Sequence, residues 1–305
     1  MTFNRRRFLQ ASAALCLFDA LGVKAATPFS GIQAPPKLRA PAGSVDCHMH
    51  LYDDRYPAAP GAKLLPPNAT LDDYRQLQSL LGLQRLVIVT PSTYGTDNRC
   101  MLEGLAQSNG KARGVAVIDR HITDAELHKM HQAGVRGIRF NLSYGGADLS
   151  DLEPLAVRVN ELGWHVQVVA PGNQLVELES RLQRLPARLV IDHFGHVPQP
   201  QGLTSPAFAV LARLLDGERT WVKLSAPYLR SRSGPPDYED IGAVARELVH
   251  RYPQRLLWGS DWPHPTVTAN KPDDGRIFDL LAQWAPDEQV RVTILRDNPV
   301  SLYGF

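Results

Sequence analysis

The 305-residue chain has 33 Lys and Arg residues against 31 Asp and Glu residues, which gives a formal charge of +2 at pH 7. This near balance gives no electrostatic reason to expect nucleic acid or an anionic membrane surface as a partner, so local residues must capture any anionic ligand. Three cysteines are too few for a disulfide framework.

Residues 1–26 are typical of a cleaved export signal. Arg5-Arg6-Arg7-Phe8-Leu9 has the pattern of a twin-arginine leader, an apolar run over 11–23 follows, and Val23-Lys24-Ala25 offers small residues for cleavage. The run is shorter than the ~20 apolar residues of a membrane span, although an amphipathic or anchoring N-terminal helix is the alternative. We therefore expect the twin-arginine export machinery as a partner, a periplasmic location, and no membrane span in the mature protein.

A second segment, residues 27–42, contains four prolines and is expected to be a linker, because proline fits neither a packed helix nor a central strand. The globular part is expected over 43–305. Its roughly 260 residues have the usual size of one (β/α)8 barrel.

Eight short apolar runs alternate with segments of helical periodicity, which is the pattern of a parallel sheet with crossover helices. Capping boxes that begin at Thr70 and Thr123, and glycine stops at Gly82 and Gly134, bound two of the helices. The count of eight favours a single α/β TIM barrel, although a doubly wound open sheet alternates in the same way. The expected strands are residues 44–48, 85–89, 112–117, 135–140, 164–169, 188–192, 220–224 and 255–259.

Residues that follow the strands of a barrel converge on one mouth, where catalytic groups lie. His48 and His50 end the first strand two residues apart, so both imidazoles should face inward, with Cys47 on the opposite side as a small core residue. His193 follows the sixth strand. Asp261 follows the eighth, as a proton acceptor or, alternatively, a helix N-cap. A pair of buried core histidines is the less favoured alternative, because adjacent imidazoles are costly to bury without a ligand.

Six motifs lie at the expected strand ends: Asp46-Cys47-His48-Met49-His50, residues 90–98, Gly137-Ile138-Arg139-Phe140-Asn141, Trp164-His165-Val166-Gln167, residues 191–196 and residues 259–264. As a set they resemble the amidohydrolase superfamily over about residues 45–305, in the amidohydrolase-related branch that contains 2-pyrone-4,6-dicarboxylate hydrolase and galactarolactone isomerase. The resemblance implies hydrolysis or rearrangement of a cyclic ester or amide. In that chemistry Asp261 would activate the attacking oxygen while the histidines polarise the carbonyl.

Metal-dependent relatives would supply a histidine from the fifth strand and often a lysine or glutamate from the fourth. Here the fourth strand carries Arg139, and the fifth places Gln167 nearer the mouth than His165. An amide is a poor zinc ligand and a fixed positive charge repels a cation, so we expect no metal or other cofactor. If Zn²⁺ is the cofactor, the ligands would be His48, His50 and Asp261, with His193 as a fourth ligand or behind them.

Arg139 is expected to hold a substrate carboxylate through two parallel hydrogen bonds, with a surface ion pair as the alternative. The loop over 141–152 contains no arginine, which favours a sugar-acid lactone over a rigid aromatic dicarboxylate. Further substrate contacts are expected from Ser92, Tyr94, Asn98, Asn141, Gln167, Tyr52, Tyr228, Arg230 and His264.

Together these features predict hydrolysis or isomerisation of a small carboxylated lactone. A zinc-dependent amidohydrolase or decarboxylase on the same scaffold is one alternative. A periplasmic protein that binds a sugar acid without turning it over is another, although binding alone needs no base at Asp261.

Overall fold

The computed structural model describes residues 27–305, so the predicted signal peptide lies outside the described residues. Residues 27–42 contain no helix or strand. Within the described range no helix is both long and apolar enough to cross a membrane.

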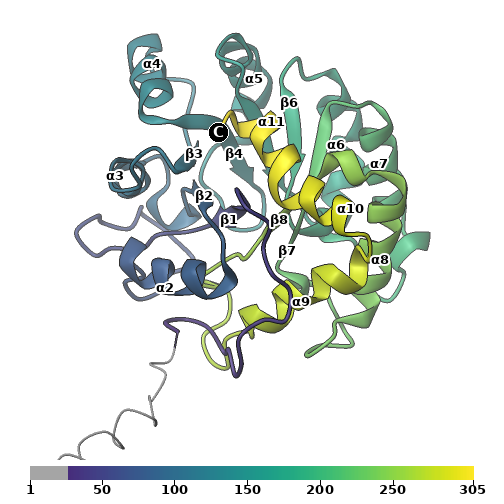
Figure 1. Cartoon of the computed structure of the whole chain (residues 1–305). Helices are drawn as coiled ribbons and strands as arrows, with labels where there is room; N and C mark the ends of the chain where they lie inside the picture. Colours follow the sequence, from purple (N-terminus) through teal and green to yellow (C-terminus); the bar gives the residue numbers. More distant parts are fainter. Residues whose placement is uncertain (1–26) are drawn as a thin grey trace, which may run out of the picture.

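Eight parallel strands form one sheet in chain order, β1 to β8 (Figure 1). Asp261 N donates to His48 O and His50 N donates to Trp262 O, both at 2.8 Å, and these bonds join the end of β8 to β1. The predicted barrel is confirmed, and the predicted strand bounds differ from the observed ones by at most one residue. The strands are β1 (Val45–Met49), β2 (Arg85–Val89), β3 (Ala112–Ala116), β4 (Val135–Asn141), β5 (His165–Val169), β6 (Arg188–Ile191), β7 (Thr220–Ser225) and β8 (Leu256–Gly259).

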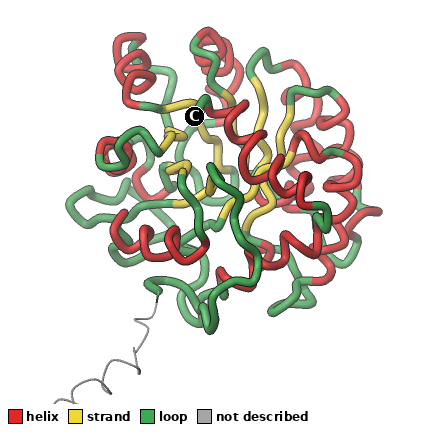
Figure 2. The backbone as a smooth tube through the Cα atoms, viewed as in Figure 1, coloured by secondary structure: helices red, strands yellow, loops and turns green. Residues whose placement is uncertain are grey.

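A helix follows every strand, and the helices surround the strands (Figure 2). The predicted capping box is present at Thr70, whose side chain accepts a hydrogen bond from Asp73 N, and Gly82 ends that helix at φ 75°. The helices are α2 (Leu71–Leu81), α3 (Arg99–Ala106), α4 (Asp124–Ala133), α5 (Leu152–Glu161), α6 (Gly172–Arg184), α7 (Pro206–Asp216), α8 (Glu239–Arg251), α9 (Asp274–Trp284), α10 (Glu288–Val292) and α11 (Asn298–Tyr303).

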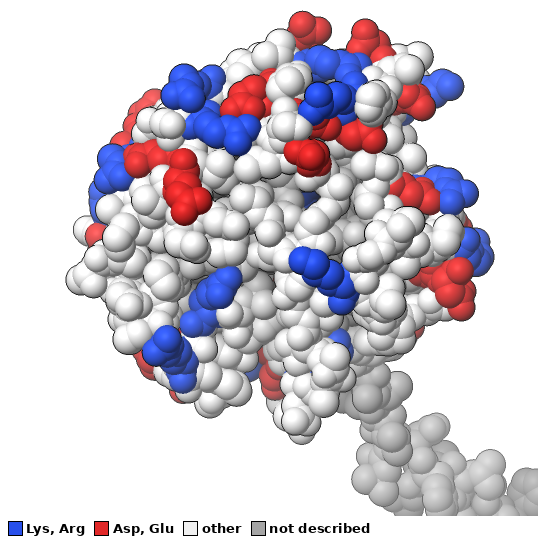
Figure 3. Space-filling view, turned by 180° about the vertical axis from the view of Figure 1, so that it is seen from behind, with Lys and Arg blue, Asp and Glu red and all other residues white. Residues whose placement is uncertain are grey.

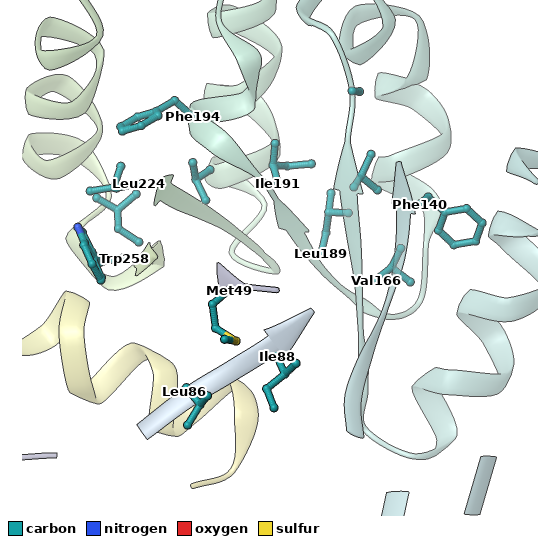
Figure 4. Close-up of a cluster of buried hydrophobic side chains, with 14 of the residues drawn as sticks. Met49, Leu86, Ile88, Phe140, Val166, Leu189, Ile191, Phe194, Leu224 and Trp258 are labelled. Carbon is teal, nitrogen blue, oxygen red and sulfur yellow. The ribbon is translucent and has the colours of Figure 1, made fainter. Parts of the chain in front are cut away.

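Alternating side chains of the strands fill two apolar layers. Leu86, Ile88, Phe140 and Ile191 belong to the outer layer between strands and helices (Figure 4). The inner layer fills the barrel and includes the buried valines of β2, β3 and β6, with Leu257 from β8. Because the barrel interior is packed, a ligand meets the barrel at its mouth and not in its core.

The C-terminal helix α11 closes the end of the barrel where the strands begin. It lies across the front of the barrel in Figure 1, and the Tyr303 ring meets the buried His165 ring edge-on at 5.2 Å. The opposite face therefore carries the mouth. Figure 3 views the molecule from behind, where acidic and basic side chains are mixed along the upper edge and the centre is mainly uncharged.

Candidate active site

Four predicted residues from three parts of the barrel meet at the mouth. His48 Nε2, His50 Nε2 and His193 Nε2 lie 3.5, 3.6 and 3.9 Å from Asp261 Oδ1. All four side chains are at most 5% exposed. The structure thus brings the residues after β1, β6 and β8 around one carboxylate oxygen, as the barrel geometry predicts.

Strand β1 departs from strict alternation just below the site. Its register against β2 shifts between Asp46 and Met49, and Cys47 packs in the inner layer. The prediction that Cys47 points away from His48 is therefore wrong, because the irregularity turns two consecutive side chains inward. Cys47 is nevertheless a buried core residue, and its burial raises the pKa of the thiol well above its usual range.

Asp46 lies between the inward-facing Val45 and Cys47, so it points outward, and it fixes the turn that carries Asp261. It accepts hydrogen bonds from Ser260 N at 3.0 Å, Ser260 Oγ at 2.6 Å and Tyr74 OH at 2.9 Å. Burial raises the pKa of Asp46 to about 6 in spite of these bonds. A Cβ at Gly259 would lie 2.6 Å from His48 Cβ, so glycine there lets β8 approach β1 closely.

Two buried charged residues behind the histidines were not among the predicted site residues. Lys223, fully buried on β7, places Nζ 2.6 Å from Gln167 Oε1, 3.1 Å from His48 Nδ1 and 3.3 Å from Asp192 Oδ1. Asp192 follows β6 and also accepts from Gln167 Nε2 at 2.8 Å. The sequence offered one sign of this pair, a lysine within an apolar strand, because a buried ammonium requires a partner of opposite charge or a hydrogen-bond acceptor.

These contacts assign the ring protons of the strand β1 histidines. A lysine ammonium only donates, so His48 Nδ1 accepts from Lys223 and His48 carries its proton on Nε2. Asp192 Oδ1 lies 3.3 Å from the same nitrogen but accepts no hydrogen bond. His50 Nδ1 faces Val89 O at 2.7 Å and must donate to it. His48 Nε2–H can then donate to His50 Nε2 at 3.2 Å.

The environment favours neutral His48 and His193 rings beside an ionised Asp261 carboxylate. Burial, with Lys223 nearby, lowers the pKa of His48 well below its usual range, and burial also lowers the pKa of His193. Burial by itself would raise the pKa of Asp261, but the nearby imidazoles of His193, His50 and His48 lower it overall. Asp261 is therefore ionised and able to accept a proton at neutral pH.

A hydrogen bond from Tyr228 also holds Asp261 through its other carboxylate oxygen, Oδ2. Tyr228 OH donates to Asp261 Oδ2 at 2.6 Å and lies 3.0 Å from His264 Nδ1. His264 Nε2 in turn lies 3.0 Å from Asp274 Oδ2 at the start of α9. These hydrogen bonds hold Asp261 through Oδ2 and leave its Oδ1 directed at the histidines.

A cavity of about 640 Å³, including its open mouth, adjoins this cluster. His50, His193 and Asp261 line it, whereas His48 lies behind them. Arg139 and Arg230 place two guanidinium groups on its wall, so an anionic ligand suits it. The predicted substrate-binding residues that line it are Tyr52, Ser92, Arg139, Asn141 and Arg230.

The other five predicted substrate-binding residues do not line this cavity. Tyr94 OH pairs with the backbone of Asp53, and Asn98 Nδ2 donates to Val117 O at 2.8 Å. Gln167 lies below the floor with Lys223, while Tyr228 and His264 support Asp261 as described above.

Part of the cluster has the donor set of a metal site. His48, His193 and Asp261 offer ligand atoms that lie within 4.8 Å of one another, and imidazole with carboxylate suits zinc. The Lys223 ammonium behind His48 and the Arg139 guanidinium on the cavity wall oppose a further cation. The spacing of the ligand atoms suits a bound metal ion, whereas the positive charges of Lys223 and Arg139 disfavour one.

Comparisons with known proteins cover nearly all of the described chain. The amidohydrolase family model matches residues 45–305. The chain is 37% identical to 2-pyrone-4,6-dicarboxylate hydrolase of Comamonas testosteroni over 281 residues, 88% of this chain and 92% of that protein. It is 36% identical to D-galactarolactone isomerase of Agrobacterium fabrum over 273 residues, 88% and 93% of the two chains. A solved apo structure from Agrobacterium tumefaciens matches with a TM-score of 0.83 and 35% identity, over 88% of this chain and 98% of that one.

Proposed function

Because this chain belongs to the amidohydrolase family, we propose that it hydrolyses or isomerises a small carboxylated lactone. It is an enzyme whose similar curated proteins include a lactone hydrolase and a lactone isomerase. The observation that carries the proposal is the position of Asp261 Oδ1, which faces three imidazoles beside a cavity with two guanidinium groups.

Asp261 is the general base of the proposed reaction. An attacking O–H in the cavity transfers its proton to Asp261 Oδ1 as its oxygen bonds to the lactone carbonyl carbon. The ring C–O bond then breaks, and the departing ring oxygen takes the proton that Asp261 received, which returns Asp261 to its ionised state. Water as the attacking group gives hydrolysis, and a hydroxyl of the substrate gives isomerisation.

His193 is the histidine best placed to polarise the carbonyl. Its ring lines the cavity, and its Nδ1 lies 2.8 Å from Ser225 Oγ. When the serine hydroxyl donates to Nδ1, the His193 proton is on Nε2, directed toward the reacting groups. An N–H at this point stabilises the negative charge that develops on the carbonyl oxygen.

The cavity wall supports an acidic substrate with further polar groups. Arg139 makes no hydrogen bond with residues 27–305 through Nε, which lies 3.5 Å from Asp192 Oδ2. Arg139 also lines the cavity, where its guanidinium can meet a substrate carboxylate. Ser92 and Asn141, hydrogen-bonded to each other at 3.0 Å, add neutral donors and acceptors, which favours a sugar-acid lactone.

We further propose that this reaction needs no resident metal, since the buried Lys223 supplies positive charge behind His48. A zinc-dependent amidohydrolase or decarboxylase is the second candidate, favoured by the spacing of the ligand atoms. If zinc binds, His48, His50 and Asp261 would hold it with His193 as a fourth ligand or behind them, and it would supply Lewis-acid polarisation of the carbonyl.

Export to the periplasm through the twin-arginine route is also part of the proposal. It is supported by Arg5-Arg6-Arg7-Phe8-Leu9 and the apolar run that follows. Fractionation of cells that express the full chain, with the twin-lysine variant Arg5→Lys/Arg6→Lys as control, tests it. Retention of the wild-type protein in the cytoplasm would contradict it.

The function is tested by screening the purified protein against D-galactarolactone and 2-pyrone-4,6-dicarboxylate, with metal content measured on the same sample. Asp261→Asn should bind the active substrate normally and turn it over at least about a hundredfold more slowly, because an amide accepts no proton. Asp72→Asn, at a side chain that is 83% exposed, is the matched control. Wild-type binding without turnover would favour a sugar-acid binding protein instead.

A further inference from the structure

A left-handed turn after β6 brings His196 to the cavity in addition to His193. Four consecutive residues, 193–196 (η3), have φ between 48° and 63°. Such a conformation costs about 1–2 kcal/mol for each residue with a side chain, so a run of this kind requires support from its surroundings. Phe194 supplies part of that support, because its ring packs edge-on against Trp284 of α9 at 5.5 Å.

The turn places His196 beside His193. In a turn with about three residues per repeat, side chains three positions apart point the same way. The two rings accordingly lie 5.5 Å apart, and both line the cavity. Sequence reasoning placed only His193 in the site.

Arg230 sets the proton position on the His196 ring. Arg230 Nε donates to His196 Nδ1 at 2.9 Å. A guanidinium remains protonated and has no acceptor, so Nδ1 must be the bare nitrogen and Nε2 must carry the proton. Burial, together with His193 and Arg230, lowers the pKa of His196 well below its usual range, which keeps this ring neutral.

The resulting N–H has no partner in the protein. His196 is 5% exposed, and its Nε2 makes no hydrogen bond with any of residues 27–305. A buried donor without a partner costs about 1–3 kcal/mol, which a ligand oxygen in the adjoining cavity would recover. Because Arg230 engages the only lone pair of the ring, His196 cannot serve as a base there.

We propose that His196 Nε2–H is a preset donor that binds an anionic oxygen of the substrate, together with the Arg230 guanidinium. This inference rests on the proposed function and deepens it, because it requires an anionic group in addition to the one at Arg139. The ligand group is a carboxylate or a sulfonate, which share acceptor-only oxygens.

Two substitutions of His196 separate its two roles, which are to donate a hydrogen bond to the cavity and to accept one from Arg230. His196→Asn places an amide oxygen near the Nδ1 position, which preserves the contact with Arg230 and removes the donor to the cavity. His196→Gln reaches the Nε2 position with an amide N–H and loses the contact with Arg230. Citrate is the probe, because its carboxylates cannot be turned over and its binding does not depend on lactone chemistry.

The proposal predicts that His196→Asn weakens citrate binding about tenfold or more, while His196→Gln stays within about threefold of wild type. The opposite order would overturn it, because His196 would then act only through Arg230. Equal affinities of the three proteins, or no citrate binding by wild type, would overturn it as well.

Nitrogen NMR of the full chain labelled with ¹⁵N-histidine gives a readout without activity. The His196 resonances, assigned by their absence in His196→Gln, should show a protonated Nε2 and a bare Nδ1, and citrate should shift the Nε2 signal. A proton on Nδ1 would overturn the proposal. A protein that meets these expectations yet converts neither lactone would contradict the proposed reaction and leave the donor site standing.

Discussion

The ammonium of Lys223 lies 3.1 Å from Nδ1 of His48, and both side chains are fully buried in the barrel. This contact determines which nitrogen of His48 carries a proton, and it supplies a cation behind that imidazole. Burial lowers the pKa of Lys223, and the Asp192 carboxylate opposes that shift. Lys223 therefore affects both the stability of the barrel and the position of the ring proton on His48.

Replacement of Lys223 by methionine should destabilise the protein by about 3–5 kcal/mol, because it leaves Asp192 as a buried carboxylate with too little positive charge nearby. Urea unfolding followed by tryptophan fluorescence measures the change. The double variant Lys223→Met/Asp192→Asn removes both charges and should recover part of the loss. A double variant as unstable as the sum of the single variants would contradict the pairing.

Replacement of Tyr228 by phenylalanine should lower kcat about tenfold and leave KM nearly unchanged, because a hydrogen bond to a charged group contributes about 1.5–3 kcal/mol. The phenol donates to Asp261 Oδ2 and lies outside the cavity lining. Steady-state kinetics on the active lactone provide the measurement. Tyr252→Phe is the matched control, since that hydroxyl donates to Asp216 at the surface. A change confined to KM would instead place Tyr228 in substrate binding.

The value of kcat/KM should level off at neutral pH, with an acid limb centred below about pH 6.5. The pKa values of His48, His193 and Asp261 are all lowered, so the active protonation state is fully present at neutral pH and is lost as pH falls through those values. A pH series with fluorescence controls for folding gives the profile. An acid limb centred at or above about 6.5, the usual histidine pKa, would be incompatible with this prediction.

Replacement of Arg139 by lysine should raise KM about tenfold for an anionic lactone and change kcat less, since an ammonium cannot form two parallel hydrogen bonds with one carboxylate. Steady-state kinetics on the substrate identified by the screen measure the change in KM and kcat. Arg213→Lys, on the exposed side of α7, is the control. An unchanged KM would remove Arg139 from substrate binding. Asp192 keeps Lys223 as its partner in this variant.

The strand pattern and the three histidines around Asp261 could be predicted from sequence because the signals are local. Apolar periodicity, the capping box at Thr70 and the glycine stop at Gly82 each depend on neighbouring residues. Once eight strands are counted, barrel geometry itself brings His48, His193 and Asp261 to one mouth. No further contact has to be known for that step.

Tertiary structure alone decided how these residues are held. Lys223 meets Gln167 and His48 across 56 and 175 positions of sequence, and no local period encodes such pairings. The irregularity in β1 and the left-handed turn at His196 also lack a local signal, because their backbone cost is offset by packing from distant segments. The sequence therefore determined which groups reach the mouth, and the closed barrel determined their proton positions, partners and directions.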